Sequence, residues 1–133
     1  MAVSAWALFW KCPRAAEPGE AALACARREL LEETGPSAAR LEPILELDLS
    51  NSLTDERAVI FLATALTAAA ARPEPTEVLR HRTAPFADVL ARVADGRIRD
   101  SLTVAAVLRA HHMAVTGRLP EPLAQAMLGR QGE

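Results

Sequence analysis

The sequence predicts an α/β (α+β) fold in which a β-sheet combines with helices in one domain. Two observations carry this prediction. Short strand-like apolar runs occur on both sides of a long helical segment, and helical periodicity returns in the last third of the chain. Half of the 133 residues are apolar, which is enough to bury a core. We therefore expect residues 1–133 to form a single globular domain.

The first strand and the best helix are expected in the N-terminal third. Residues 6–12 alternate, but both faces are fairly apolar, which predicts a buried strand. Pro18 and Gly19 predict a turn. The segment from Glu20 to Thr34 contains neither Gly nor Pro, and Gly35 follows in the position of a C-terminal cap. These features predict a helix over residues 20–34.

Two more strands and a third, shorter one are predicted next. Leucines alternate with acidic residues over residues 45–49, which predicts a half-exposed strand. Residues 58–66 are almost wholly apolar and predict a buried strand, joined to the first by the polar turn 50–57. After a Pro-rich loop, residues 78–82 predict a short strand.

The C-terminal part predicts helices. Apolar residues recur at helical spacing from Phe86 and stop at Gly96. Asp100 or Ser101 can cap the helix that follows, because short polar side chains accept hydrogen bonds from the first free backbone amides. The tail from Pro120 predicts a weak amphipathic turn or two.

Composition excludes several classes of function. Fifteen basic and seventeen acidic residues give a net charge of −2, which argues against nucleic acid and anionic membranes as partners. Residues 1–13 fit neither a signal peptide nor a membrane span, which predicts a cytoplasmic protein. In that compartment Cys12 and Cys25 are expected to be reduced thiols. The histidines show no zinc-site spacing and are expected at surfaces or helix ends: His81, His111 and His112.

Three carboxylates are concentrated on one side of the predicted helix. Glu32 and Glu33 follow Glu29 by three and four residues, so the three side chains share one patch. Like charges at this spacing destabilise a helix, and a hard divalent cation would neutralise them. The alternative is a solvated acidic face with no ligand. An apolar stripe is expected on a different face: Leu23, Ala26 and Leu30.

The run Arg28-Glu29-Leu30-Leu31-Glu32-Glu33-Thr34-Gly35, separated from Glu20 by seven residues, resembles the signature of the Nudix hydrolases. The resemblance implies a Nudix-like mixed β-sheet sandwiched by helices, with the signature box over residues 14–36 and a tail over residues 118–133. Two positions depart from the signature: Arg14 stands where the family has glycine, and Pro36 stands where it has an apolar residue.

The resemblance also implies roles for individual residues. Glu29 and Glu33 would be the main metal ligands, Glu32 a further ligand or the base that acts on water, and Arg28 would orient a carboxylate. Arg14 and Glu56 are candidates for substrate binding. Glu20, a partner of Arg28 or a helix-dipole residue, and Gly35 would be structural.

By the same resemblance, the chain is expected to be an ADP-ribose pyrophosphatase-like hydrolase. It would use Mg²⁺, with Mn²⁺ as the alternative, to cleave the diphosphate of ADP-ribose or a nucleotide sugar. Two alternatives remain open: a catalytically impaired Nudix-like domain that binds nucleotide or a protein, and a plain helical interaction module. With about nine residues before Trp10, the N-terminal strands of the family are short or missing, and a homodimer partner or an upstream segment could supply them.

Overall fold

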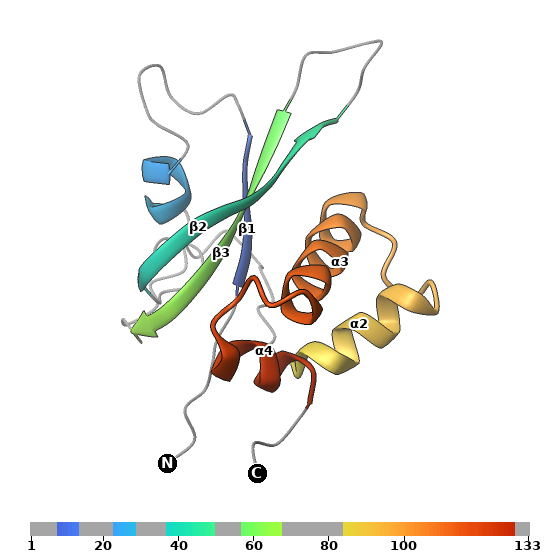
Figure 1. The fold of residues 1–133 in the computed structure, drawn as a ribbon. Helices are drawn as coiled ribbons and strands as arrows, with labels where there is room; N and C mark the ends of the chain where they lie inside the picture. Colours follow the sequence, from blue (N-terminus) through green and yellow to red (C-terminus); the bar gives the residue numbers. More distant parts are fainter. Residues whose placement is uncertain (1–7, 14–22, 29–36, 50–56, 68–83, 130–133) are drawn as a thin grey trace, which may run out of the picture. The chain divides into compact units, whose positions relative to one another are not determined.

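The computed structural model describes residues 8–13, 23–28, 37–49, 57–67 and 84–129. The chain divides into two compact units, residues 6–81 and residues 82–133 together with 1–5. The first unit contains strands and a helical segment at residues 23–28, and the second contains helices (Figure 1). The labelled elements are β1 (Leu8–Pro13), β2 (Ser37–Asp48), β3 (Arg57–Thr67), α2 (Phe86–Ala94), α3 (Ser101–Val115) and α4 (Glu121–Met127). Helices and sheet together confirm the predicted α/β class.

The three described strands form one antiparallel sheet in the order β1-β3-β2. In the centre, Phe61 lies opposite Trp10 of β1 and Pro43 of β2. Residues 60–63 are all buried, with exposures of 0–3%. Because successive side chains of a strand point to opposite faces, burial of consecutive residues means that β3 is covered on both faces. The buried strand predicted at residues 58–66 is therefore confirmed as β3. The short strand predicted at residues 78–82 lies outside the described residues.

The second strand differs from its prediction. β2 begins at Ser37, well before the predicted residues 45–49, and its register shifts between Pro43 and Leu45. The buried residues of β2 are Leu41 and Ile44, whereas Leu49 is 43% exposed and lies beyond the strand. The prediction of a half-exposed strand is confirmed up to Asp48, because Leu45 and Leu47 are half-buried and the acidic residues between and after them are exposed. The pattern missed the earlier part of β2, where the irregular register near Pro43 interrupts the two-residue alternation.

The helical unit follows its prediction closely. Gly96 has a φ of 84° just after α2, in the left-handed region that glycine adopts readily. Asp100 is the N-cap of α3: its carboxylate accepts hydrogen bonds from the backbone N–H and the hydroxyl of Thr103 at 3.0 and 2.7 Å. Of the two predicted caps, the structure therefore selects Asp100. The predicted C-terminal turn is the helix α4.

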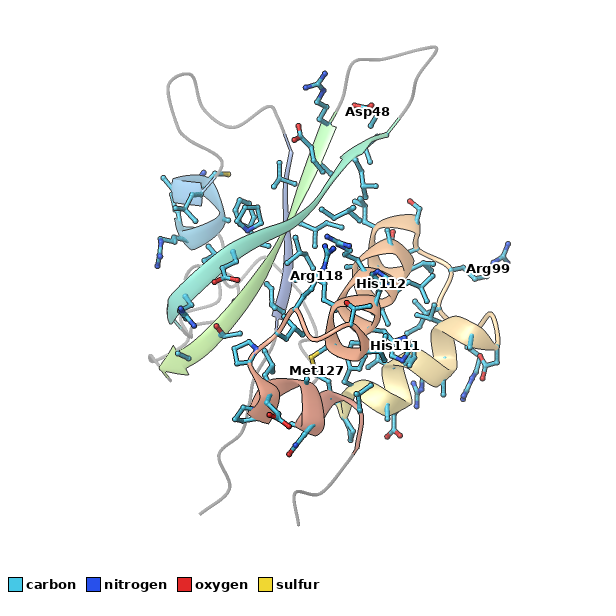
Figure 2. All side chains as sticks on the ribbon, viewed as in Figure 1. Asp48, Arg99, His111, His112, Arg118 and Met127 are labelled. Carbon is cyan, nitrogen blue, oxygen red and sulfur yellow. The ribbon has the colours of Figure 1, made fainter. Side chains whose placement is uncertain are left out.

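The buried residues of α3 are mostly small. α3 packs against both α2 and α4. α2 buries none of its residues completely, whereas Met127 of α4 is 4% exposed and points toward α3 (Figure 2). The buried residues of α3 are Ala106, Val107, Ala110 and Ala114. Alanines permit close approach between helices, but each contributes little apolar area.

A charged turn connects α2 and α3. Arg97 donates from its backbone N–H and its Nε to the two carboxylate oxygens of Asp95, at 3.0 and 2.7 Å. The hydrogen bond from the Arg97 side chain holds the pKa of Asp95 below its usual value, and the same contact raises the pKa of Arg97. Both side chains are exposed, so solvent screens most of this interaction.

Candidate active site

The described beginning of the predicted carboxylate helix is helical. In the segment 23–28, Cys25 and Ala26 are buried, with exposures of 1 and 0%, whereas Arg27 and Arg28 are exposed. The predicted buried stripe is correct at Ala26 and wrong at Leu23, which is 41% exposed. A helix turns by about 100° per residue, so Leu23 lies on nearly the opposite side from Cys25. The centre of the buried face is therefore at Cys25 and Ala26.

Of the predicted site residues, the structure describes only Arg28, the last described residue of this helix, and its side chain is exposed. The other predicted site residues lie outside the described residues: Arg14, Glu20, Glu29, Glu32, Glu33, Gly35 and Glu56. Within the described ranges there is no group of three or more His, Cys, Asp or Glu side chains that could hold a metal ion. The geometry of the carboxylate cluster accordingly stays a prediction.

The prediction of reduced thiols is wrong. Cys25 is disulfide-bonded, and no cysteine in the described part of the chain is free. The sequence has one other cysteine, Cys12, and its backbone lies in β1 next to Pro13. Compartment arguments treat cysteines statistically, whereas a disulfide needs two particular residues to meet in the fold. The only sequence signal was the even number of cysteines.

Ion pairs lie at the end of the β2–β3 hairpin where residues 49–56 connect the two strands. The guanidinium of Arg57 lies 3.3 Å from Asp48 and 3.7 Å from Glu46, and Figure 2 shows Asp48 at the end of β2. All three side chains are more than half exposed, so each pair contributes at most about 1 kcal/mol to stability. These contacts fix the strand ends that flank the turn 50–56, in which the candidate residue Glu56 lies.

The two described histidines lie on α3 (Figure 2). His111 is half-buried and His112 is exposed. The carbonyl oxygen of His112 accepts hydrogen bonds from the backbone N–H and the hydroxyl of Thr116, at 3.0 and 2.7 Å, where the helix ends. Their positions confirm the prediction of surface and helix-end histidines, and His81 lies outside the described residues.

Comparison with known proteins decides the family. The model of the NUDIX domain matches residues 15–106 of the chain. The chain belongs to the Nudix family. This confirms the resemblance inferred from the run 28–35. Across the described ranges, no helix has the length and apolar character needed to cross a membrane.

The similar curated proteins are all named as pyrophosphatases of nucleoside diphosphate sugars. The chain is 33% identical over 108 residues to an ADP-ribose pyrophosphatase of Mycobacterium tuberculosis, an alignment that covers 79% of this chain and 52% of that protein. It is 36% identical over 90 residues to GDP-mannose pyrophosphatases of Yersinia pestis and Yersinia pseudotuberculosis, covering 61% of this chain and 42% of those proteins. The chain thus spans about half the length of the curated relatives it matches.

Proposed function

We propose that this Nudix protein is a Mg²⁺-dependent pyrophosphohydrolase that cleaves the diphosphate of a nucleoside diphosphate derivative, such as ADP-ribose or a nucleotide sugar. Family membership supports the reaction class, and the names of the relatives support the substrate class. A net charge of −2 favours a small molecule over nucleic acid as the substrate.

The observation that carries this proposal is the buried face of the helix 23–28. Residues three, four, seven and eight positions apart share one side of a helix. If the helix continues to Thr34 as its sequence predicts, Glu29 and Glu33 extend the buried stripe that begins at Cys25 and Ala26. Carboxylates on a buried face need a positive partner, because an unpaired buried charge is strongly unfavourable. Mg²⁺ fits this need, since it prefers oxygen ligands.

Glu32 falls at the edge of the same stripe, on the side of exposed Arg28. There it can reach the site as a further ligand or take a proton from the attacking water, while the Arg28 guanidinium orients a neighbouring carboxylate. A bound Mg²⁺ supplies the positive charge that stabilises negative charge developing on the phosphate oxygens. Glu20 and Gly35 are proposed to be structural, and Arg14 and Glu56 to contact the substrate.

The test compares two Glu→Gln changes of equal size. We expect Glu33→Gln to lower the Mg²⁺-dependent release of AMP from ADP-ribose by about 100-fold or more. Mutation of a residue that only orients a metal ligand already lowers metal affinity or activity by about 10–100-fold, and Glu33 is proposed to be a ligand itself. The control is Glu42→Gln, a change of an exposed residue on β2, which should leave turnover unchanged. Full activity of Glu33→Gln, or no turnover of wild-type protein on ADP-ribose, GDP-mannose and related compounds, would refute the proposal.

A second candidate function rests on Arg14, which replaces the family glycine and lies immediately before the matched range 15–106. A side chain restricts the turn that glycine permits. A Nudix-like domain impaired there would bind nucleotide or a protein partner without turnover. Calorimetry with ADP-ribose, run beside the AMP-release assay, separates the two functions. Binding without Mg²⁺-dependent turnover favours the second function. If Arg14→Gly then restores turnover, Arg14 is the cause of the impaired activity.

The remaining proposals concern the state of the protein. We propose that residues 1–133 act as one domain in the cytoplasm and that a homodimer covers edges of the sheet, in which β1 and β2 are the outer described strands. Exposed strand edges favour association. Sedimentation of the protein at several concentrations tests the dimer, and a monomer throughout would contradict it.

A further inference from the structure

Cys25, which is disulfide-bonded, lies in the helix that carries the proposed site. Cys25 is 1% exposed and lies one helical turn before Glu29, so in the predicted helix the two residues share a face. The other cysteine, Cys12, lies opposite Val59 of the central strand, and the next residue, Pro13, lies opposite Ala58. A bond between these cysteines would therefore attach the beginning of the carboxylate helix to the end of β1, an outer strand of the described sheet.

We propose that Cys12 and Cys25 form a reversible disulfide that orders the carboxylate helix, and that its reduction weakens metal binding and turnover at the proposed site. This inference rests on the proposed function for its catalytic part. The segment closed by the bond, residues 13–24, contains both Arg14 and Glu20. The bond thus restrains the loop that departs from the Nudix signature together with the helix that carries the signature.

The reversibility of the bond is inferred from the cytoplasmic location proposed above, because the cytoplasm is a reducing compartment. In reducing compartments, persistent structural disulfides are rare, and those that occur are usually catalytic or redox-sensing. A dithiol reductant supplies two electrons and two protons. One of its thiolates attacks a sulfur, breaks the S–S bond and forms a mixed disulfide with one cysteine. The second thiolate then attacks the reductant's own sulfur in that mixed disulfide and displaces the cysteine, so that Cys12 and Cys25 end as protonated thiols and the reductant as a disulfide. Because Cys25 is buried, attack on its sulfur requires local opening of the segment 23–28.

The direction of the effect comes from the entropy of the loop. With the bond intact, the helix start has fewer conformations, so the carboxylates lose less freedom when they bind a cation. After reduction the loop regains conformations, and the helix start loses this covalent restraint while Cys25 and Ala26 stay buried. We expect metal affinity to fall roughly tenfold, the lower limit found when a partner that positions ligands is removed.

Three measurements on the full chain test the proposal. Non-reducing peptide mapping should find the peptides of Cys12 and Cys25 linked. Hydrogen exchange of residues 23–28 should become faster after treatment with dithiothreitol, and Mn²⁺ binding followed by calorimetry should weaken, together with turnover. In Cys12→Ser the same treatment should change none of these quantities, and Cys25→Ala provides a second variant in case the first fails to fold.

The outcomes separate this inference from the proposed function. Unlinked cysteines, or equal exchange of residues 23–28 in both redox states, would overturn the inference even if the protein turns over substrate. Redox-dependent exchange and metal binding without turnover in either state would support the disulfide device and refute the pyrophosphohydrolase. Faster exchange with unchanged Mn²⁺ affinity would overturn the link to the metal site.

Discussion

The central strand and the helical unit bury their residues in different ways. The large side chains of β3 are buried on both faces of the strand, including Ile60, Phe61 and Leu62. In contrast, α3 buries mainly alanines, and α2 buries none of its residues completely. Buried apolar area sets the hydrophobic contribution to stability. The sheet therefore depends on a few large side chains, and the helices depend more on local features such as the Asp100 cap. Changes in the two regions should differ in size accordingly.

The largest effect is expected in β3. Ile60→Ala should lower the free energy of unfolding by about 2–5 kcal/mol, because it removes buried methyl groups and leaves a cavity. Native-state hydrogen exchange should show this loss in β3 and α3 alike if residues 1–133 form one cooperative domain. Unchanged exchange in α3 would contradict the single-domain prediction. Val115→Ala is the control, because Val115 is 53% exposed and should change stability by less than about 0.5 kcal/mol.

A smaller effect is expected at the helix cap. Asp100→Ala should lower the free energy of unfolding by about 1 kcal/mol, since the backbone N–H of Thr103 loses its acceptor. Asp100→Asn keeps an acceptor oxygen and should retain most of the stability. Urea unfolding of both variants measures the difference. Equal loss in the two would mean that the charge of Asp100, rather than its hydrogen bond, stabilises α3.

Two Ala→Gly changes should have opposite signs. Ala65 of β3 is exposed and has a φ of 53°, which is unfavourable for any residue with a Cβ. Ala65→Gly should therefore raise stability by up to about 1 kcal/mol. Ala91→Gly, in the middle of α2 and also exposed, should lower stability by about 1 kcal/mol. Thermal unfolding of both variants tests this prediction. A shift of Tm in the same direction for both would contradict it.

The smallest effect is expected at the turn between α2 and α3. The pKa of Asp95 is lower in the folded protein than its usual value of 3.8, because Arg97 donates to the charged carboxylate. Its contribution to stability is therefore present above pH 3.8 and is lost as the pH falls through the lowered folded-state pKa. Arg97→Met, which keeps the carboxylate, should reduce this loss in acid unfolding curves. An identical pH dependence in the variant would show that the pair does not affect stability.

The sequence predicted elements best where local signals were sufficient. The apolar run at 58–66 located β3, and Gly96 and Asp100 marked the end of α2 and the start of α3. Prediction from the sequence failed where the structure of one segment depends on contacts with a second segment. The bulge near Pro43 depends on pairing with β3, and the disulfide at Cys25 depends on where two separate segments meet.

The candidate site shows the same division. The Nudix motif was recognisable because its residues lie close together in the sequence, and the family match confirms it. Local spacing also placed Arg28 in a helix. It did not identify the buried face, which is centred on Cys25 and Ala26 rather than Leu23, because the contacts of a helix with the rest of the fold choose that face.

The strand order β1-β3-β2 has a consequence for the order of folding. β2 and β3 are joined by residues 49–56 only, whereas β1 reaches its place beside β3 after the whole segment 14–56. Closing a short loop costs less entropy than closing a long one, so we expect the β2–β3 hairpin to form first and β1 to dock later. The predicted carboxylate helix, residues 20–34, lies inside the segment 14–56. Its final placement is therefore expected to be among the last steps of folding, when β1 completes the described sheet.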